Sequence, residues 1–264
     1  MQRVYNDLDM DRSVDYDAIA EVYDCRYDRS DYGPVLQLLL RFVRGSRHVL
    51  EVGCGTGYWL QALRRQGCDV VGLDPSINML RIARRKSRQP SFIKACAEAI
   101  PCRQTFFDRV FCVNSFHHFV DKRRFLTEAH RLLRPGGGIM IVGLDPHTGL
   151  DRWWIYDYFR QVIEMNKRRY PSAGQMRNLM AAYGFVSIST AEALHMPLQI
   201  SARSALETGR LAKTTTSQLS LLTDDEYDEG MRRLRADIDA SEGQGRALTI
   251  GADLRLYATI GWPE

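Results

Sequence analysis

Three glycines at alternate positions follow a short apolar stretch, residues 49–52, which also contains Glu51. Glycines let a backbone turn tightly and leave no Cβ where a ligand must lie close. A second apolar run ends in Asp74, 21 residues beyond Gly53. That is close to the ~20-residue spacing at which a carboxylate on the next strand reaches ribose hydroxyls. The pair predicts a nucleoside-containing ligand across the carboxyl ends of two neighbouring strands.

The glycine spacing also indicates which nucleoside binds. Dinucleotide folds use G-x-G-x-x-G beneath a pyrophosphate. Here the pattern is G-x-G-x-G, and Tyr58 stands where the third glycine of a dinucleotide site would be. Glu51 is poorly placed for a phosphate but suits an ammonium group. S-adenosylmethionine (SAM) carries adenosine and an ammonium and no phosphate, so it is favoured over the rival interpretation, an NAD-dependent oxidoreductase.

Apolar segments of strand length alternate with helical patterns through most of the chain. This alternation predicts an α/β fold with a parallel, doubly wound sheet. The expected strands cover residues 47–52, 69–73, 91–96, 108–114, 139–144, 185–191 and 254–260.

Five segments together resemble the class I SAM-dependent methyltransferases, in the branch of the ubiquinone and menaquinone C-methyltransferases. They are the glycine loop at 49–59, Asp74, and the stretches 97–101, 113–119 and 131–137. The resemblance implies a seven-stranded Rossmann-like sheet of order 3-2-1-4-5-7-6. We expect four parts: an N-terminal helical lid (1–45), a SAM-binding core (46–196), a helical cap or interface insertion (197–250) and the last strand (251–264). The insertion is expected because the gap between the last two strands is too long for a bare hairpin loop.

The resemblance also assigns the cofactor site, with S-adenosylhomocysteine as the product. Glu51 would meet the ammonium, Asp74 the ribose hydroxyls, and Asn114 would close the site near the sulfur. The methionine part would cross the loop, and the adenine would lie between the remaining side chains. The full expected set is Tyr23, Glu51, Gly53, Cys54, Gly55, Asp74, Pro75, Ile77, Ala97, Glu98 and Asn114.

Two adjacent histidines, His117 and His118, follow the fourth expected strand, beside the expected methyl group. Imidazole has the pKa range of a general base, so both are catalytic candidates, although a purely structural role is the plainer interpretation. His147 and His195 are weaker candidates. Adjacent loop histidines rarely converge on one metal ion and no third ligand is apparent, so no metal site is expected.

Aromatic residues gather in two further places. Tyr16, Tyr23 and Tyr27 recur at helical spacing near the N-terminus and are candidates for a lid over the cofactor, or they only anchor that helix. The segment 153–159 holds several aromatic side chains directly after the fifth expected strand. It either lines a pocket for a flat or apolar acceptor or packs into a core.

The composition limits the classes of binding partner that we expect. A net charge of +4 is slight, and the cluster Arg81, Arg84, Arg85, Lys86 and Arg88 is interpreted as a solvated helix end rather than a nucleic-acid patch. No apolar run approaches the ~20 residues that span a bilayer. We expect a cytoplasmic enzyme with a small-molecule acceptor and neither nucleic acid nor membrane as partner.

Two alternatives remain open on sequence grounds. The chain could bind SAM without transferring its methyl group, as a regulator or a catalyst of another reaction. The apolar stripe on the charged helix expected over 223–240 could serve as a homodimer interface, which is compatible with methyl transfer.

Overall fold

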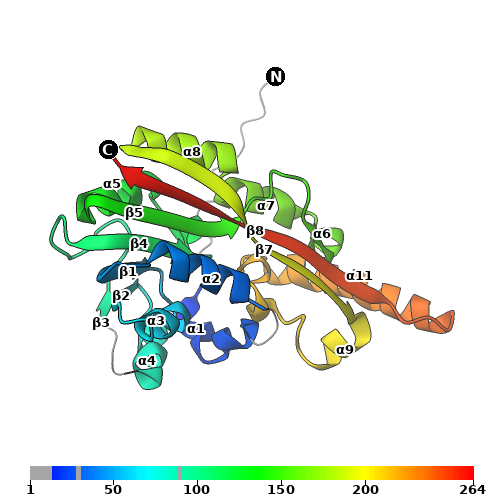
Figure 1. Ribbon diagram of the computed structural model, residues 1–264. Coiled ribbons are helices and arrows are strands. Elements are labelled where there is room, and N and C mark those ends of the chain that lie inside the picture. Colours follow the sequence, from blue (N-terminus) through cyan, green and yellow to red (C-terminus); the bar gives the residue numbers. More distant parts are fainter. Residues whose placement is uncertain (1–13, 28–30, 88–90) are drawn as a thin grey trace.

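The computed structural model describes residues 14–27, 31–87 and 91–264. The predicted lid range therefore lies partly outside the described residues, as does Arg88 of the basic cluster. One sheet runs through the molecule, with helices on both of its faces (Figure 1). Within the described ranges, each helix is too short or too polar to cross a bilayer.

The sheet confirms the predicted fold class. Its strands are β1 (His48–Val52), β2 (Asp69–Asp74), β3 (Ser91–Lys94), β4 (Phe107–Val113), β5 (Leu133–Leu144), β6 (Arg152–Trp153), β7 (Phe185–Ser201) and β8 (Thr249–Pro263). Strands β1 to β5 are parallel in the order β3-β2-β1-β4-β5. The antiparallel β8 lies between β5 and β7, as predicted for the last strand. The order differs in one detail, because the two-residue β6 also pairs with β8.

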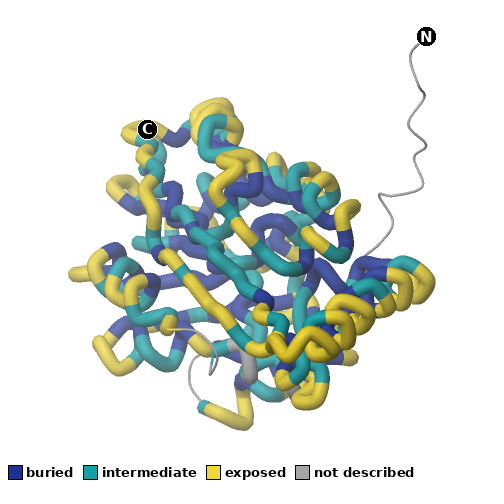
Figure 2. Tube along the Cα trace, turned by 90° about the vertical axis from the view of Figure 1, so that its right-hand side faces the viewer, coloured by how far each residue is buried: buried dark blue, intermediate teal, exposed yellow. Residues whose placement is uncertain are grey.

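Both faces of the sheet are buried because its central strands carry apolar side chains on both faces. In β1, Val49 packs in one cluster and Leu50 in the other, and both side chains are fully buried. The first cluster includes side chains of α2 (Gly33–Phe42), α3 (Tyr58–Arg64) and α4 (Ile77–Lys86). The second includes those of α5 (Lys122–Leu132) and α8 (Ala173–Ala182). Figure 2 shows buried segments running through the middle of the molecule and exposed ones at its rim.

Side-chain caps fix where several helices begin. The Ser76 hydroxyl accepts a hydrogen bond from Met79 N and starts α4. Two capping boxes are present, Ser172 with Gln175 before α8 and Thr223 with Glu226 before α11 (Asp224–Gly243). These caps satisfy backbone donors that the first helical turn leaves without partners.

The N-terminal helices, α1 (Tyr16–Ile19) and η2 (Ala20–Arg26), lie against α4. Asp17 accepts hydrogen bonds from the Ser76 hydroxyl at 2.5 Å and from Asn78 N at 3.0 Å. Glu21 pairs with Arg85 at 3.1 Å, and Asp24 pairs with Lys86. Part of the basic cluster therefore binds acidic side chains of the chain's own N-terminal segment.

A second layer, which we call the cap layer, extends along the outer parts of β7 and β8 and includes α11 (Figure 1). It contains η3 (Phe116–His118) at its border and α6 (Trp154–Tyr158), α7 (Gln161–Arg169), α9 (Ala202–Glu207), η4 (Lys213–Thr215), α10 (Ser217–Ser220) and α11. This layer has its own apolar core, in which Phe159, Leu234 and Ile238 are buried. The predicted stripe of α11 thus faces this core.

Strands β7 and β8 are longer than predicted. The sequence predicted residues 185–191 and 254–260, whereas the paired strands run from Phe185 opposite Pro263 to Ser201 opposite Thr249. Pairing along the whole length satisfies backbone groups of the outer segments, 192–201 and 249–253, whose own sequence does not mark them as strand. The predicted domain boundaries at 196 and 250 therefore fall inside these strands.

Candidate active site

A cavity opens at the carboxyl ends of β1, β2 and β4, and we call it the cofactor cavity. The glycine loop, the end of β2, residues 96–98 and the segment after β4 form its walls. Tyr16 and Tyr23 from the N-terminal helices also line it. Of the predicted cofactor residues, those that line it are Tyr23, Gly53, Gly55, Asp74, Pro75, Ala97, Glu98 and Asn114.

The glycine loop could not carry larger residues at its first position. Gly53 has a φ of +74°, and a Cβ there would lie 2.5 Å from the Cβ of Ser115. The Ser115 hydroxyl donates to Val52 O at 2.9 Å, which holds it against the loop. The amides of Gly53 and Cys54 donate to Leu73 O at the end of β2. Close packing and a left-handed backbone together require glycine at this position.

Asp74 ties the loop to the end of β2. Its carboxylate accepts hydrogen bonds from Gly55 N at 2.8 Å and from Ser76 N at 2.9 Å. Burial raises the pKa of Asp74, and the two backbone donors partly oppose that shift. The side chain is buried yet lines the cavity, and carboxylate oxygens have several acceptor sites. It can therefore accept ribose hydroxyls as well as backbone amides.

Glu51 lies beneath the loop and is 1% exposed. Its Oε2 has no hydrogen-bond partner in the described part of the structure. Burial, with the nearby Asp74 carboxylate, holds the pKa of Glu51 well above its usual range. A buried carboxyl oxygen without a partner is costly unless a ligand supplies a donor or a cation. An ammonium group is such a ligand, so this residue fits SAM.

Other predicted residues lie differently. The Cys54 thiol is buried in the core, where burial raises its pKa, and it lies outside the cavity lining. Ile77 is 37% exposed and also lies outside the lining, whereas Met79, two residues further along α4, contributes to it. Glu98 lines the cavity, but its Oε1 accepts from Asp121 N at 3.1 Å. Met79 lies three residues after Ser76, which caps α4, and this spacing is a signal in the sequence that could have identified Met79 as a cavity residue.

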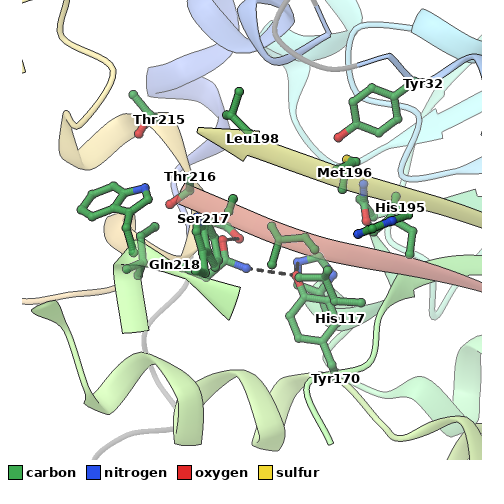
Figure 3. Close-up of a pocket in the computed structure, with 18 of the residues that line it drawn as sticks. Tyr32, His117, Tyr170, His195, Met196, Leu198, Thr215, Thr216, Ser217 and Gln218 are labelled. Carbon is green, nitrogen blue, oxygen red and sulfur yellow. Dashed lines mark hydrogen bonds between the residues drawn. The ribbon is translucent and has the colours of Figure 1, made fainter. Parts of the chain in front are cut away.

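A second cavity, of about 410 Å³, adjoins the first, and we call it the acceptor cavity (Figure 3). Its walls come from η3, α6, the end of α7, the β7–β8 strands and residues 215–218. Trp153 and Trp154 line it, whereas Phe159 is fully buried in the core of the cap layer. The aromatic segment thus contributes both to a pocket and to a core.

The two cavities meet at three residues. Tyr16, Asn114 and His118 line both of them. Asn114 has a φ of +52°, a backbone conformation that asparagine adopts more readily than most residues. The segment after β4 and the N-terminal helix therefore form the junction between the cavities.

The four candidate histidines have different surroundings. His117 is buried and stacks on Tyr170, and its Nε2 lies 2.9 Å from the Tyr170 hydroxyl. His118 contacts the Tyr16 hydroxyl at 2.5 Å. His195 lines the acceptor cavity, with its Nε2 2.5 Å from Asp253 Oδ1. His147 is bound instead to backbone carbonyls at the end of α7, including Lys167 O.

Comparison with known proteins agrees with this geometry. A family model described as a methyltransferase domain matches residues 50–141. Demethylmenaquinone methyltransferase of Thermotoga maritima is 30% identical over 154 residues, which are 54% of this chain and 66% of that protein. The enzyme of the same name from Thermus thermophilus is 27% identical over 199 residues, 64% of this chain and 90% of its own length. The chain belongs to the class I SAM-dependent methyltransferases.

Solved structures share the fold. A putative methyltransferase from an antibiotic biosynthesis pathway of Anabaena variabilis superposes with a TM-score of 0.64. It is 21% identical, and the match covers 85% of this chain and 96% of that one. At this identity the likeness concerns the fold alone, so the acceptor has to be inferred from the residues of this methyltransferase.

Proposed function

We propose that this methyltransferase transfers the methyl group of SAM to a small aromatic acceptor bound in the acceptor cavity. The observation that supports this most directly is the junction, where Tyr16, Asn114 and His118 line both cavities. Two ligands that meet there would have their reacting atoms held in line and shielded from water, which is what methyl transfer mainly requires.

The cofactor cavity fits SAM, which supplies an electrophilic methyl group when bound. Asp74 would accept the ribose hydroxyls, and Ala97 and Glu98 would border the adenine. Glu51 would compensate the ammonium from beneath the loop, directly or through water. Tyr23 would cover the site, since its ring lies 3.6 Å from the position of a Cβ on Gly55.

The charges around the junction favour a neutral or anionic acceptor over an amine. Arg169 contacts His118, and burial together with the nearby Arg169 charge lowers the pKa of Lys122. Arg210 lines the acceptor cavity, where Asp31 is the acidic side chain and already binds Gly33 N. Aromatic walls formed by Trp153 and Trp154 suit a flat ring.

An acceptor panel tests this proposal. We would incubate the protein with SAM and one candidate acceptor at a time. Three candidates are aromatic hydroxyl compounds (1,4-dihydroxynaphthalene, 2-naphthol and catechol), and two are amines (phosphoethanolamine and spermidine). We expect S-adenosylhomocysteine and a methylated product, detected by mass spectrometry, with the aromatic hydroxyl compounds only. Turnover of the amines alone would overturn the acceptor class. SAM binding without product from any compound would instead favour the alternative, a SAM-binding protein that does not transfer methyl.

A further inference from the structure

Both ring nitrogens of His118 are engaged within the protein. Its Nδ1 lies 3.2 Å from Nη2 of Arg169, the last residue of α7. Its Nε2 lies 2.5 Å from the hydroxyl oxygen of Tyr16. These two contacts come from segments far apart in the chain and meet at the junction of the two cavities.

The Arg169 contact decides where the imidazole proton lies. A guanidinium has only donors, so Nδ1 of His118 must be the acceptor. A neutral imidazole that accepts at one nitrogen carries its proton on the other. His118 therefore holds its proton on Nε2 and donates it to the Tyr16 oxygen. In this arrangement the imidazole is a hydrogen-bond donor toward the junction.

The other histidine of the pair is held in a comparable way. The Gln218 amide donates to the Tyr170 hydroxyl at 3.3 Å, as the dashed line in Figure 3 marks. The Tyr170 hydroxyl can then donate its own proton to Nε2 of His117, 2.9 Å away. The acceptor nitrogen of His117 is thus also used inside the protein, and neither histidine is arranged as a general base.

Arg169 brings a largely buried positive charge to this place. Its Nη1 is buried and has no hydrogen-bond partner, and in the described part of the chain no carboxylate forms an ion pair with it. Burial lowers the pKa of Arg169, but a guanidinium stays charged in proteins. An uncompensated buried cation stabilises negative charge that a ligand brings nearby.

We propose that Arg169 is a positioning residue that fixes His118 as a neutral Nε2–H donor, so that His118 and Tyr16 bind an acceptor that reacts as an oxyanion. This inference rests on the proposed function and specifies its substrate class as phenols or enols acidic enough to lose their proton to water before they react. The electron pair of the acceptor forms the new bond to the methyl carbon. The pair of the broken carbon–sulfur bond stays on sulfur, so no proton has to leave within the site.

The tautomer of His118 can be measured without any acceptor. In protein labelled with ¹⁵N-histidine and saturated with S-adenosylhomocysteine, long-range ¹H–¹⁵N spectra at pH 8 should show His118 protonated on Nε2. The resonance is assigned by its absence in His118→Gln. In Arg169→Met, which removes the donor, we expect a mixture of the two tautomers, whereas Arg169→Lys should keep Nε2–H. Arg160→Gln, an exposed arginine just before α7, is the matched control and should leave the spectrum unchanged.

Kinetics with 1,4-dihydroxynaphthalene test the catalytic consequence. Arg169→Met should lower kcat on the order of tenfold or more, while the calorimetric Kd for SAM stays within about twofold and Arg169→Lys recovers part of the rate. His118 protonated on Nδ1 in the wild-type protein would overturn the inference. So would unchanged kcat in Arg169→Met, or a loss of SAM affinity with no change of tautomer. The spectra reveal the tautomer even if no acceptor is turned over, so this failure is distinguishable from that of the proposed function.

Discussion

At the scale of single residues, two buried carboxylates lie at the cofactor site: Asp74 lines the cavity, and Glu51 lies outside its lining, beneath the glycine loop. Asp74 has backbone partners on both oxygens, whereas Glu51 has an oxygen without any. They differ because Asp74 ends its strand beside two backbone amides and Glu51 points beneath the loop. The first is suited to hydroxyl donors and the second to a cation.

Replacing Asp74 tests the first role. Asp74→Ala should weaken SAM binding by about 1.5–3 kcal/mol, the range for hydrogen bonds to a charged group. Calorimetry gives the Kd, and circular dichroism checks that the variant is folded. Asp69→Ala, at the exposed start of the same strand, should leave the Kd unchanged. A folded Asp74→Ala protein with wild-type affinity would contradict the assignment.

The raised pKa of Glu51 predicts that SAM binding releases a proton. Because its pKa is raised when no ligand compensates it, the carboxyl binds a proton more tightly than usual. An ammonium ligand favours the charged form, so SAM binding should release up to about one proton and tighten as pH rises above the usual range of a glutamate. Calorimetry in buffers of different ionisation enthalpy measures this release. Glu51→Gln should abolish it, and an equal release from that variant would rule Glu51 out as its source.

At the scale of elements, polar contacts attach the described part of the N-terminal segment to the core, and we propose that this segment acts as a lid. Tyr16 and Tyr23 line the cofactor cavity. Asp17, Glu21 and Asp24 bind α4 and the residue that caps it. The contacts involve exposed groups and are individually weak. Such a lid can hold SAM and still open for exchange.

Removing the best-defined of these contacts should loosen the lid. We expect Asp17→Ala to weaken SAM affinity, chiefly through faster dissociation. Hydrogen bonds from Ser76 and Asn78 lower the pKa of Asp17, so the wild-type contact should be lost as pH falls through that lowered value. Stopped-flow fluorescence measures the dissociation rate. Asp228→Ala, on the remote helix α11, is the control, and equal rates in both variants would mean that the lid does not retain SAM.

Helix α11 packs on the cap layer through a glycine. A Cβ on Gly230 would lie 2.1 Å from the ring of Phe159, which is fully buried. Gly230→Ala should therefore destabilise the protein by about 1–3 kcal/mol. Gly243, at the end of the same helix, has open space around it, so Gly243→Ala should be neutral or stabilising by up to about 1 kcal/mol. The thermal unfolding temperatures of the two variants test this. An equal change in both would show that Gly230 is not packed against Phe159.

At the scale of the whole molecule, the two cavities belong to different layers. The sheet supplies the cofactor cavity, and the layer with its own core supplies much of the acceptor cavity. Strand β8 joins them, because it pairs with β5 in the sheet and with β7 and β6 beyond it. The acceptor cavity therefore depends on how these layers are held together.

Asp151 lies at this connection and makes stability depend on pH. Its Oδ1 accepts from Arg255 N of β8 at 3.0 Å, and its Oδ2 is buried without a partner. Burial raises its pKa to about 6 from 3.8, so the folded state binds the proton more tightly than the unfolded state. The contribution of Asp151 to the free energy of unfolding is fully present below pH ~4 and is lost as pH rises through about 6. Asp151→Asn should therefore unfold at a higher temperature than wild type at pH 7.5 but not at pH 4, as calorimetry would show. An equal difference at both pH values would contradict this.

Much of the sheet and the cofactor cavity could be predicted from sequence because their signals are local. The glycine loop, the acid that ends β2 and the apolar strands are contiguous patterns, and parallel strands bring their carboxyl ends to one edge. The two capping boxes are likewise local patterns of the sequence. The length of β7 was underestimated because its outer half is held by pairing with β8 and not by its own composition.

The sequence by itself thus determined the ligand class, through Gly53, Glu51 and Asp74, since backbone freedom and a fixed spacing are properties of the chain. Only the tertiary structure decided what the histidine pair can do. His118 has partners 102 and 51 residues away, Tyr16 and Arg169, and no pattern along the chain records that they meet. Hydrogen-bond roles are set by neighbours in space, so the acceptor side of the site became interpretable only in the folded molecule.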